Sequence, residues 1–294
     1  MENNLELLPL TDDYIFKRVF AYKGNESVLK DFLEALLKIE IKEIKITNPE
    51  IIPYEKGEKR GLLDIKAEIN DGTILDIEMQ MENERNTEER ATEYIGKMIS
   101  EQLQVGDNYK TLKKSIVIFI ANYNFLKRNS YHNIGRMKFE ETLEDEYVNM
   151  GYEKEEKIAS KYIEFHYIEL PKFKKRNPSK FTKLDQWMCI FTQNKEGIML
   201  AEKENKEIKR AINTLDFLSK DPKERERHNS IVMAEYNRLV SQQNFFEDGK
   251  KEGRIEGEKS KSIEIAKKLL KADFSKEEIK ALTGLTNEEI EKLV

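Results

Sequence analysis

One stretch of the chain, residues 62–81, constrains the fold more than any other. Its sequence, LLDIKAEINDGTILDIEMQM, consists of two runs of alternating apolar and polar residues that are separated by Asn70-Asp71-Gly72. Alternation with a period of two is typical of half-buried strands, and Asn-Asp-Gly is a strong turn signal. We therefore expect a β-hairpin in which each strand buries one face.

The pairing of the two strands decides what this hairpin can do. A two-residue loop would turn the apolar residues of the two strands toward opposite sides of the sheet, so their burial would be lost. A three-residue loop with Gly72 in the left-handed conformation instead pairs Lys66 with Asp76 and Asp64 with Glu78. The paired residues Ile65 and Ile77, Ala67 and Leu75, and Ile69 and Thr73 then share one face, and the carboxylates of Asp64 and Glu78 lie side by side on the other.

Two carboxylates on directly opposed residues repel each other, because their Cβ atoms are about 4.5–5.5 Å apart. A hard divalent cation, which prefers oxygen ligands, would relieve this repulsion. The alternative is an ordinary acidic face exposed to solvent, on which Lys66 and Asp76 form a surface ion pair that contributes little to stability. The hairpin alone leaves both interpretations open.

The rest of the first two thirds of the chain predicts an α/β domain. Two amphipathic helices flank Gly24-Asn25, and Thr11 is the candidate N-cap of the first. Further elements are expected as a strand at 41–47, a long helix at 87–105, a strand at 115–121 and a last strand at 161–170. The run at 115–121 is apolar throughout, which indicates a central strand buried on both faces. The polar stretch between the last two strands is expected to contain a loop at Tyr131-His132-Asn133.

The arrangement of Asp64 on the first strand of the hairpin and Glu78-Met79-Gln80 on the second resembles the core motif of PD-(D/E)XK nucleases. The strings DYIFKRVF at 13–20 and DFLEALL at 31–37, and the spacings R-x-x-x-Y and Q-L-x-x-G-x-x-Y on the helix after the hairpin, are also similar. More narrowly, the chain resembles the Rpn family of recombination-promoting nucleases, also described as PD-(D/E)XK nuclease family putative transposases. The resemblance extends over nearly the whole chain and is most specific over residues 11–120.

This resemblance implies a restriction-endonuclease-like mixed sheet flanked by helices and followed by an all-helical C-terminal region. It also implies that Asp64 and Glu78 hold Mg²⁺, or Mn²⁺, and that the third motif position orients or activates the attacking water. That position is Gln80 here instead of Lys. Because an amide cannot accept a proton at neutral pH, the water would depend on the metal for its acidity.

The helix after the hairpin is expected to contribute contacts to the phosphate groups of the substrate. The resemblance implies that Arg90 and Gln102 face the phosphate-binding side, and Tyr94, one turn after Arg90, is expected either there or in the core. Arg90 or Lys66 would help to neutralise the scissile phosphate. The predicted activity is that of a metal-dependent endonuclease with DNA as its substrate. The family name further implies roles in recombination, mobile elements or defence.

Composition and charge limit the other classes of protein. The net charge of −5 is not that of a non-specific nucleic-acid coat protein. No apolar run approaches the length of a membrane span, and the N-terminus lacks a secretory signal pattern, so no membrane partner is expected. The single cysteine, Cys189, fits a reducing cytoplasm and is interpreted as a core residue. The three histidines show no zinc spacing, and the basic run at 171–183 is interpreted as a solvated loop.

From residue 186 onward the chain is predicted to be helical. We expect a nuclease-like domain at 1–185, a helical extension at 186–244, and a charged linker with a small helical tail at 245–294. Within the last part, residues 245–258 are expected to form a linker or an exposed helix, because glycines recur there.

The tail contains two capping boxes, Ser275-x-x-Glu278 and Thr286-x-x-Glu289, each of which opens a short helix. These two helices are acidic, whereas a DNA-recognition helix should be basic. The tail is therefore expected to be a packing or self-association module through which the chain forms a homo-oligomer.

Two alternatives to the nuclease remain open from the sequence. Gln80 in the place of lysine is compatible with a catalytically weak or inactive descendant that uses the nuclease scaffold to bind DNA or a protein partner. The helical tail is compatible with an interaction protein that functions as an oligomer. Comparison of DNA cleavage by the wild type and by Asp64→Ala separates the enzyme from both.

Overall fold

The computed structural model describes residues 7–48, 64–70, 72–139, 158–176 and 181–293. The chain divides into two compact units, Met1–His228 and Asn229–Val294, which are described separately below. The three-part division expected from the sequence stays a prediction.

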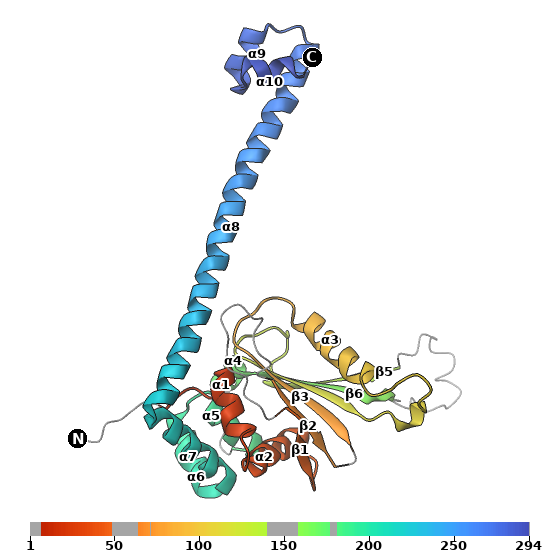
Figure 1. The fold of residues 1–294 in the computed structure, drawn as a ribbon, viewed down its shortest axis with the longest axis vertical. Coiled ribbons are helices and arrows are strands. Elements are labelled where there is room, and N and C mark those ends of the chain that lie inside the picture. The colour runs from red at the N-terminus through yellow and green to blue at the C-terminus, as the bar shows by residue number, and fades with distance from the viewer. Residues whose placement is uncertain (1–6, 49–63, 71, 140–157, 177–180, 294) are drawn as a thin grey trace, which may run out of the picture. The chain divides into compact units, whose positions relative to one another are not determined.

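The first unit is built on a six-stranded mixed sheet with the order β1-β2-β3-β4-β6-β5 (Figure 1). The strands are β1 (Ile44–Ile46), β2 (Ile65–Ile69), β3 (Thr73–Gln80), β4 (Ser115–Ala121), β5 (His132–Lys138) and β6 (Ile158–Glu169). Strands β3, β4 and β6 run parallel, whereas β1, β2 and β5 pair with their neighbours in the antiparallel direction. The mixed sheet with flanking helices is the fold class predicted from the sequence, which is thereby confirmed.

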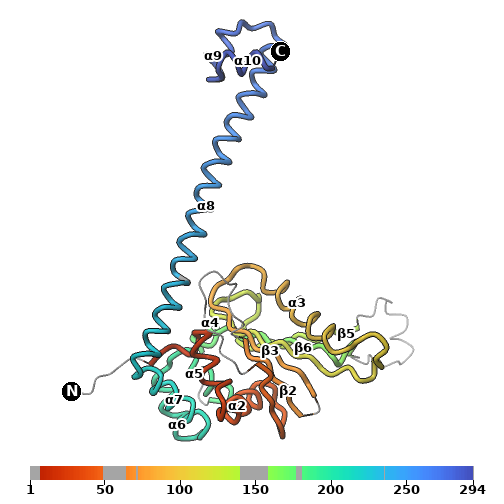
Figure 2. Tube along the Cα trace, in the orientation of Figure 1, coloured from red at the N-terminus to blue at the C-terminus, as the bar shows by residue number. Residues whose placement is uncertain are grey.

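Helices cover both faces of this sheet. They are α1 (Asp13–Phe20), α2 (Glu26–Leu37), α3 (Thr87–Ser100), α4 (Leu170–Lys174), α5 (Lys183–Phe191), α6 (Lys195–Glu204) and α7 (Lys206–Lys220), with a 3₁₀ turn η1 at Tyr109–Thr111. Helix α3 is the crossover that connects the parallel strands β3 and β4, as the path of the chain in Figure 2 shows. It buries Ala91 and Ile95 against Val117 and Phe119 of β4, which is buried along its whole length as expected for a central strand.

The helix layer on the face of the sheet opposite α3 contains helices from both the beginning and the end of the first unit. Aromatic rings of α1, α2 and α5 pack together, with the Phe20 and Trp187 centroids 5.4 Å apart and those of Phe32 and Phe191 5.7 Å apart. The Trp187 indole donates a hydrogen bond to Asp31 at 2.9 Å. Helices that come after β6 in the sequence therefore complete the core of the domain that the first two helices begin.

The single cysteine lies in this layer. Cys189 is fully buried on α5, and burial raises the pKa of its thiol to about 11. A thiol in this state is a packing residue and not a nucleophile. Its interpretation as a core residue is confirmed.

Several boundaries differ from those expected. Tyr131-His132-Asn133 was expected in a loop, but His132 begins β5, an edge strand whose exposed residues lack the alternation that marks a half-buried strand. Helix α3 ends at Ser100 instead of Val105, and β1 is limited to Ile44–Ile46. The N-cap of α1 is Asp12 and not Thr11, because the Asp12 carboxylate accepts the Ile15 N–H.

The second unit contains most of α8 (Pro222–Lys271), α9 (Lys276–Thr283) and α10 (Asn287–Glu291). Residues 245–258 are helical and exposed, so the exposed helix and not the linker is correct. Both predicted capping boxes are formed, and Gly284 ends α9 with a φ of 70°. A small core of Ala266, Ile279, Leu285 and Ile290 joins these helices. Among the described residues, no helix is long and apolar enough to cross a membrane.

Candidate metal centre

The hairpin of β2 and β3 has the register that its apolar pattern predicts. Ile69 pairs with Thr73, Ala67 with Leu75, and Lys66 with Asp76. Ile65, Ala67, Ile69, Leu75 and Ile77 are buried on one face of the hairpin. The acids lie on the other face, where Ile74 packs against the cluster that includes Ala91 and Ile95 of α3. Asp64 directly precedes β2, where continuation of this register places it opposite Glu78.

The turn that fixes this register depends on two residues with positive φ. Gly72 has a φ of 94°, as the three-residue loop requires, and its N–H donates to the Ile69 carbonyl at 3.1 Å. Asn70 also has a positive φ, of 49°. The Asn70 side chain accepts the Lys42 N–H at 2.7 Å and donates to the Glu40 carbonyl at 3.0 Å, so it ties the turn to the segment before β1.

Three carboxylates meet on the α3 face of the hairpin. Asp64, Asp76 and Glu78 each place one carboxylate oxygen so that the three atoms lie within 4.8 Å of one another. Asp64 is 8% exposed and Asp76 is 2% exposed. No described residue donates a hydrogen bond to Oδ1 of either aspartate. Buried carboxylate oxygens without a donor are rare in folded proteins, and a cation is one partner that would satisfy both.

Burial and mutual repulsion raise the pKa values of two of these acids. Burial, followed by the charges of Asp64 and Glu78, raises the pKa of Asp76 to about 8. Burial and the charge of Asp64 raise the pKa of Glu78 to about 7, against the opposing effect of Arg90. Without a cation, the cluster therefore holds protons near neutral pH that carboxylates in water would have released.

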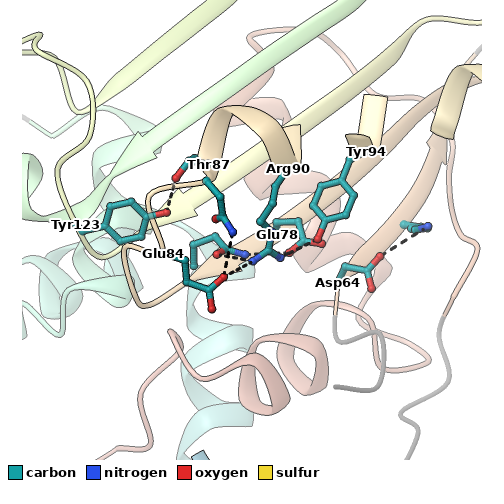
Figure 3. A network of polar contacts seen from close by, with 10 residues as sticks. Asp64, Glu78, Glu84, Thr87, Arg90, Tyr94 and Tyr123 are labelled. Atoms are coloured by element: carbon teal, nitrogen blue, oxygen red, sulfur yellow. Dashed lines mark hydrogen bonds and ion pairs between the residues drawn. The ribbon is translucent and has the colours of Figure 1, made fainter. Parts of the chain in front are cut away.

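Arg90 of α3 reaches the cluster from above the sheet (Figure 3). Its Nη1 donates to Oε1 of Gln80 at 3.1 Å, and its Nη2 donates to the Tyr94 hydroxyl at 2.7 Å and to Oε2 of Glu78 at 3.5 Å. Glu84, in the loop between β3 and α3, lies 3.7 Å from the same guanidinium. Figure 3 shows Arg90 between Glu84 on one side and Glu78 and Tyr94 on the other.

Gln80 and Tyr94 are held in place by these contacts. The Gln80 amide donates to Oε2 of Glu78 at 3.3 Å while its oxygen accepts from Arg90. Burial and the charge of Glu78 raise the pKa of Tyr94 to about 12, so its hydroxyl keeps its proton. Tyr94 was expected either on the phosphate-binding side or in the core, and it contributes to both. Its hydroxyl accepts from Arg90, and its ring stacks on Phe119 with centroids 6.0 Å apart.

The remaining two residues selected from the sequence lie differently. The Lys66 ammonium is 3.9 Å from Oδ2 of Asp64, so its ion pair is with Asp64 and not with Asp76, the residue opposite it in the ladder. Gln102 is apart from the cluster. Its side chain donates to Met98 O and Ser115 Oγ and accepts the Lys113 N–H at 2.7 Å, so it joins the end of α3 to the start of β4.

One acid of the cluster, Asp76, was not selected as a site residue. Its position opposite Lys66 suggested a surface ion pair, whereas its side chain is buried between Asp64 and Glu78. A signal was present in the sequence, since Asp76 and Glu78 are two residues apart on one strand and must face the same side.

The three acids suit a hard divalent cation, since they offer only carboxylate oxygens, and one oxygen of Asp64 and one of Asp76 have no hydrogen-bond partner among the described residues. The model of one family, described as PD-(D/E)XK nuclease family transposase, matches residues 10–239. The chain belongs to this family. No curated protein and no solved structure matches the chain.

Membership in the PD-(D/E)XK nuclease family transposases agrees with the fold and with the position of the acids. The match includes the whole sheet, helices α1 to α7 and the beginning of α8. It ends at residue 239, so α9 and α10 lie outside it.

Proposed function

We propose that this family member is a divalent-metal-dependent DNA endonuclease, and that Asp64, Asp76 and Glu78 hold the ion. One observation carries the proposal. Three carboxylates from two adjacent strands converge within 4.8 Å, and buried oxygens of two of them meet no donor among the described residues. A cluster that served only as a solvated acidic face would not bury Asp76 to 2% exposure.

Mg²⁺ is the proposed ion, with Mn²⁺ as a substitute. When bound, such an ion supplies the acidity of a coordinated water and stabilises charge on the leaving oxygen. The three acids contribute three negative charges and only oxygen ligands, which is the ligand type that both ions accept.

The other residues of the site would orient groups and balance charge. Gln80 restrains Glu78 and Arg90 through its two hydrogen bonds and retains one amide hydrogen that could orient a water. Arg90 presents a guanidinium that suits a phosphate oxygen, and Tyr94 restrains its rotation. Lys66, half-buried beside Asp64, is a second cation within reach of a bound phosphodiester.

Plasmid nicking tests this proposal. Wild-type protein is incubated with supercoiled plasmid in Mg²⁺, in Mn²⁺ and in EDTA, beside Asp64→Asn and a control, Glu68→Gln. Glu68 is an exposed acid on the same face of β2, outside the cluster. We expect metal-dependent nicking that Asp64→Asn abolishes and Glu68→Gln retains. Equal nicking by all three proteins would show that the cut is not made at this cluster, and no nicking by the wild type in either metal would remove the endonuclease.

We also propose that the second unit assembles the chain into a homo-oligomer. The part of α8 in this unit exposes large apolar side chains, among them Tyr236 at 60%, Phe245 at 75% and Phe246 at 72%. Sedimentation equilibrium of the full chain, compared with Phe245→Ser/Phe246→Ser, tests this assembly. An unchanged mass for the variant would argue against it. A reducing cytoplasm is the proposed location, in keeping with the one buried thiol.

A further inference from the structure

A polar loop leaves the sheet directly beside the candidate metal centre. Residues 122–131 connect β4 to β5, and the Asn122 N–H donates to the Gln80 carbonyl at 2.9 Å. Strands β3 and β4 run parallel and Gln80 pairs with Ala121, so the loop begins at the same end of the sheet as the C-terminal end of β3. A substrate strand that enters the metal centre from this end of the sheet would pass close to the loop.

A buried ion pair fixes the backbone of this loop. Glu169, at the end of β6, has no exposed surface, and its Oε1 accepts the N–H of Phe125 at 2.8 Å and of Leu126 at 3.2 Å. Lys172 of α4 pairs with the other oxygen of Glu169 and donates to the Leu126 carbonyl at 2.8 Å. These interactions hold the backbone of Phe125 and Leu126 in place before any ligand binds.

Two aromatic rings are presented by this backbone. The Tyr123 hydroxyl shares a hydrogen bond of 2.8 Å with Thr87 Oγ1 at the start of α3, as Figure 3 shows. The Phe125 ring meets Tyr167 of β6 edge to face at 5.2 Å and lies 5.9 Å from the Tyr123 ring. Both side chains are only half-buried. They are anchored along one side while part of each remains open to solvent.

The charge of the loop is wholly positive. Residues 122–131, NYNFLKRNSY, contain Lys127 and Arg128 and no acid, in a chain whose net charge is −5. Both cations are exposed, and neither forms an ion pair within the described part of the chain. Lys172, by contrast, is occupied by Glu169 and cannot serve as a free contact.

We propose that residues 122–131 bind an unpaired stretch of DNA next to the phosphate at the metal centre, an inference that rests on the proposed function. Tyr123 and Phe125 stack on bases, while Lys127 and Arg128 contact the backbone. Bases in a duplex are stacked on each other and offer no free face to an aromatic ring, so a duplex would use only the two cations. The combination of anchored rings and unpaired cations therefore favours a single strand, a flap or a melted end.

Fluorescence anisotropy in EDTA, where metal-dependent cleavage is prevented, measures this preference directly. A labelled 20-nucleotide single strand is compared with the duplex of the same sequence. The wild type binds the single strand more tightly. Tyr123→Leu and Phe125→Leu each weaken single-strand binding roughly 5- to 150-fold. Tyr123→Phe, which keeps the ring and loses only the bond to Thr87, binds like the wild type.

Two further variants separate stacking from charge. Lys127→Gln/Arg128→Gln reduces the slope of log K against log salt by about 1.4, since each phosphate contact to a single strand contributes about 0.7. Tyr109→Leu is the matched aromatic control, because Tyr109 is 83% exposed and lies just before β4, at the opposite end of that strand. Its binding is unchanged. Thermal melting of each variant ensures that affinities are compared per folded molecule.

The outcomes distinguish this inference from the proposed function. Metal-dependent nicking by the wild type together with unchanged single-strand binding by Tyr123→Leu and Phe125→Leu would overturn the role of the loop and leave the nuclease intact. Loop-dependent single-strand binding without nicking would support the loop and overturn the nuclease. A preference for duplex, or no binding of either DNA by the wild type, would also overturn the inference.

Discussion

The side-chain oxygen of Gln80 accepts a hydrogen bond from Nη1 of Arg90 at 3.1 Å, while the amide of Gln80 donates to Glu78 at 3.3 Å. A lysine at this position could not make the first contact, because an ammonium group has three donors and no acceptor. The glutamine therefore links a cation on α3 to an acid on β3. Arg90 brings to the site the positive charge that a lysine on the motif strand would otherwise supply.

Replacement of Arg90 tests this division of roles. In Arg90→Gln, the site loses the guanidinium that faces Gln80, Glu78 and Tyr94, and with it the fork that would contact a phosphate oxygen. We expect DNA cleavage to fall about 100-fold, as for removal of one donor to a transition-state oxyanion. Initial rates of plasmid nicking in Mn²⁺ measure the loss. Lys97→Gln, an exposed substitution on the same helix, should retain the full rate, and an equally active Arg90→Gln would remove Arg90 from the mechanism.

Replacement of Asp76 should lower the affinity for metal and raise the thermal stability of the metal-free protein. Asp76→Asn removes one negative charge from the cluster, so affinity for Mn²⁺ should fall roughly tenfold or more. In EDTA, folding of the wild type requires Asp76 either to take up a proton or to stay charged beside Asp64 and Glu78, and an amide carries neither cost, so the melting temperature should rise. Isothermal titration with Mn²⁺ and thermal melting in EDTA measure the two effects. Glu68→Gln should change neither quantity. An affinity for Mn²⁺ that is the same in Asp76→Asn as in the wild type would exclude Asp76 as a ligand.

The sequence contained enough information for the hairpin but not for the whole cluster. Only one register puts the buried residues Ile65, Ala67, Leu75 and Ile77 on one face, and that register brings Asp64 and Glu78 together. It also places Asp76 opposite Lys66, which suggested an ion pair between them. Register specifies which Cα atoms are neighbours and not where a flexible side chain ends, so the contact of Lys66 with Asp64 and the burial of Asp76 required the structure.

One element was missed and another was left open between two alternatives, for different physical reasons. Strand β5 lies at the edge of the sheet with most of its side chains exposed, so no apolar alternation marks it. Residues 245–258 are helical although glycines recur there, since helix propensity is a weak preference that its surroundings can override. The backbone of the loop at 122–131 is held by Glu169 and Lys172, which are more than forty residues away in the chain, so no local sequence pattern predicts its conformation.

The stability of the metal-free protein should decrease as pH rises from 7 to 9. The pKa of Asp76 is about 8 and that of Glu78 about 7 in the folded state, well above their ordinary values of 3.8 and 4.5. The folded state therefore binds more protons than the unfolded state in this window, and the free energy of unfolding falls by about 1–2 kcal/mol as they are lost. Burial lowers the pKa of His132 to about 4, so the effect of His132 on the pH dependence of stability is confined to pH values below this window.

Urea unfolding in EDTA at pH 7, 8 and 9 measures this trend. Added Mn²⁺ should reverse it, because the ion binds the ionised carboxylates and competes less with protons at higher pH. Asp76→Asn in EDTA is the control and should show a flatter dependence. A free energy of unfolding that is independent of pH in the wild type would contradict the raised pKa values.

The close contact between α5 and α6 gives a prediction about packing alone. A Cβ added to Gly197 would lie 2.3 Å from the sulfur of Cys189, which is buried in the core. Gly197→Ala gains up to about 1 kcal/mol in helix propensity, but overpacking costs about 1–3 kcal/mol. The added Cβ would also lie 3.0 Å from the Cβ of Cys189, which rotation of that side chain cannot move, so we expect net destabilisation. Adding Cys189→Ala removes the sulfur, and the double variant should lose less stability than the sum of the single variants.

Gly96→Ala on α3, where an added Cβ meets nothing within 4 Å, should instead be stabilising by about 0.5–1 kcal/mol. Urea midpoints of the four variants measure these differences, and equal midpoints for Gly197→Ala and Gly96→Ala would show that the two helices can separate without cost.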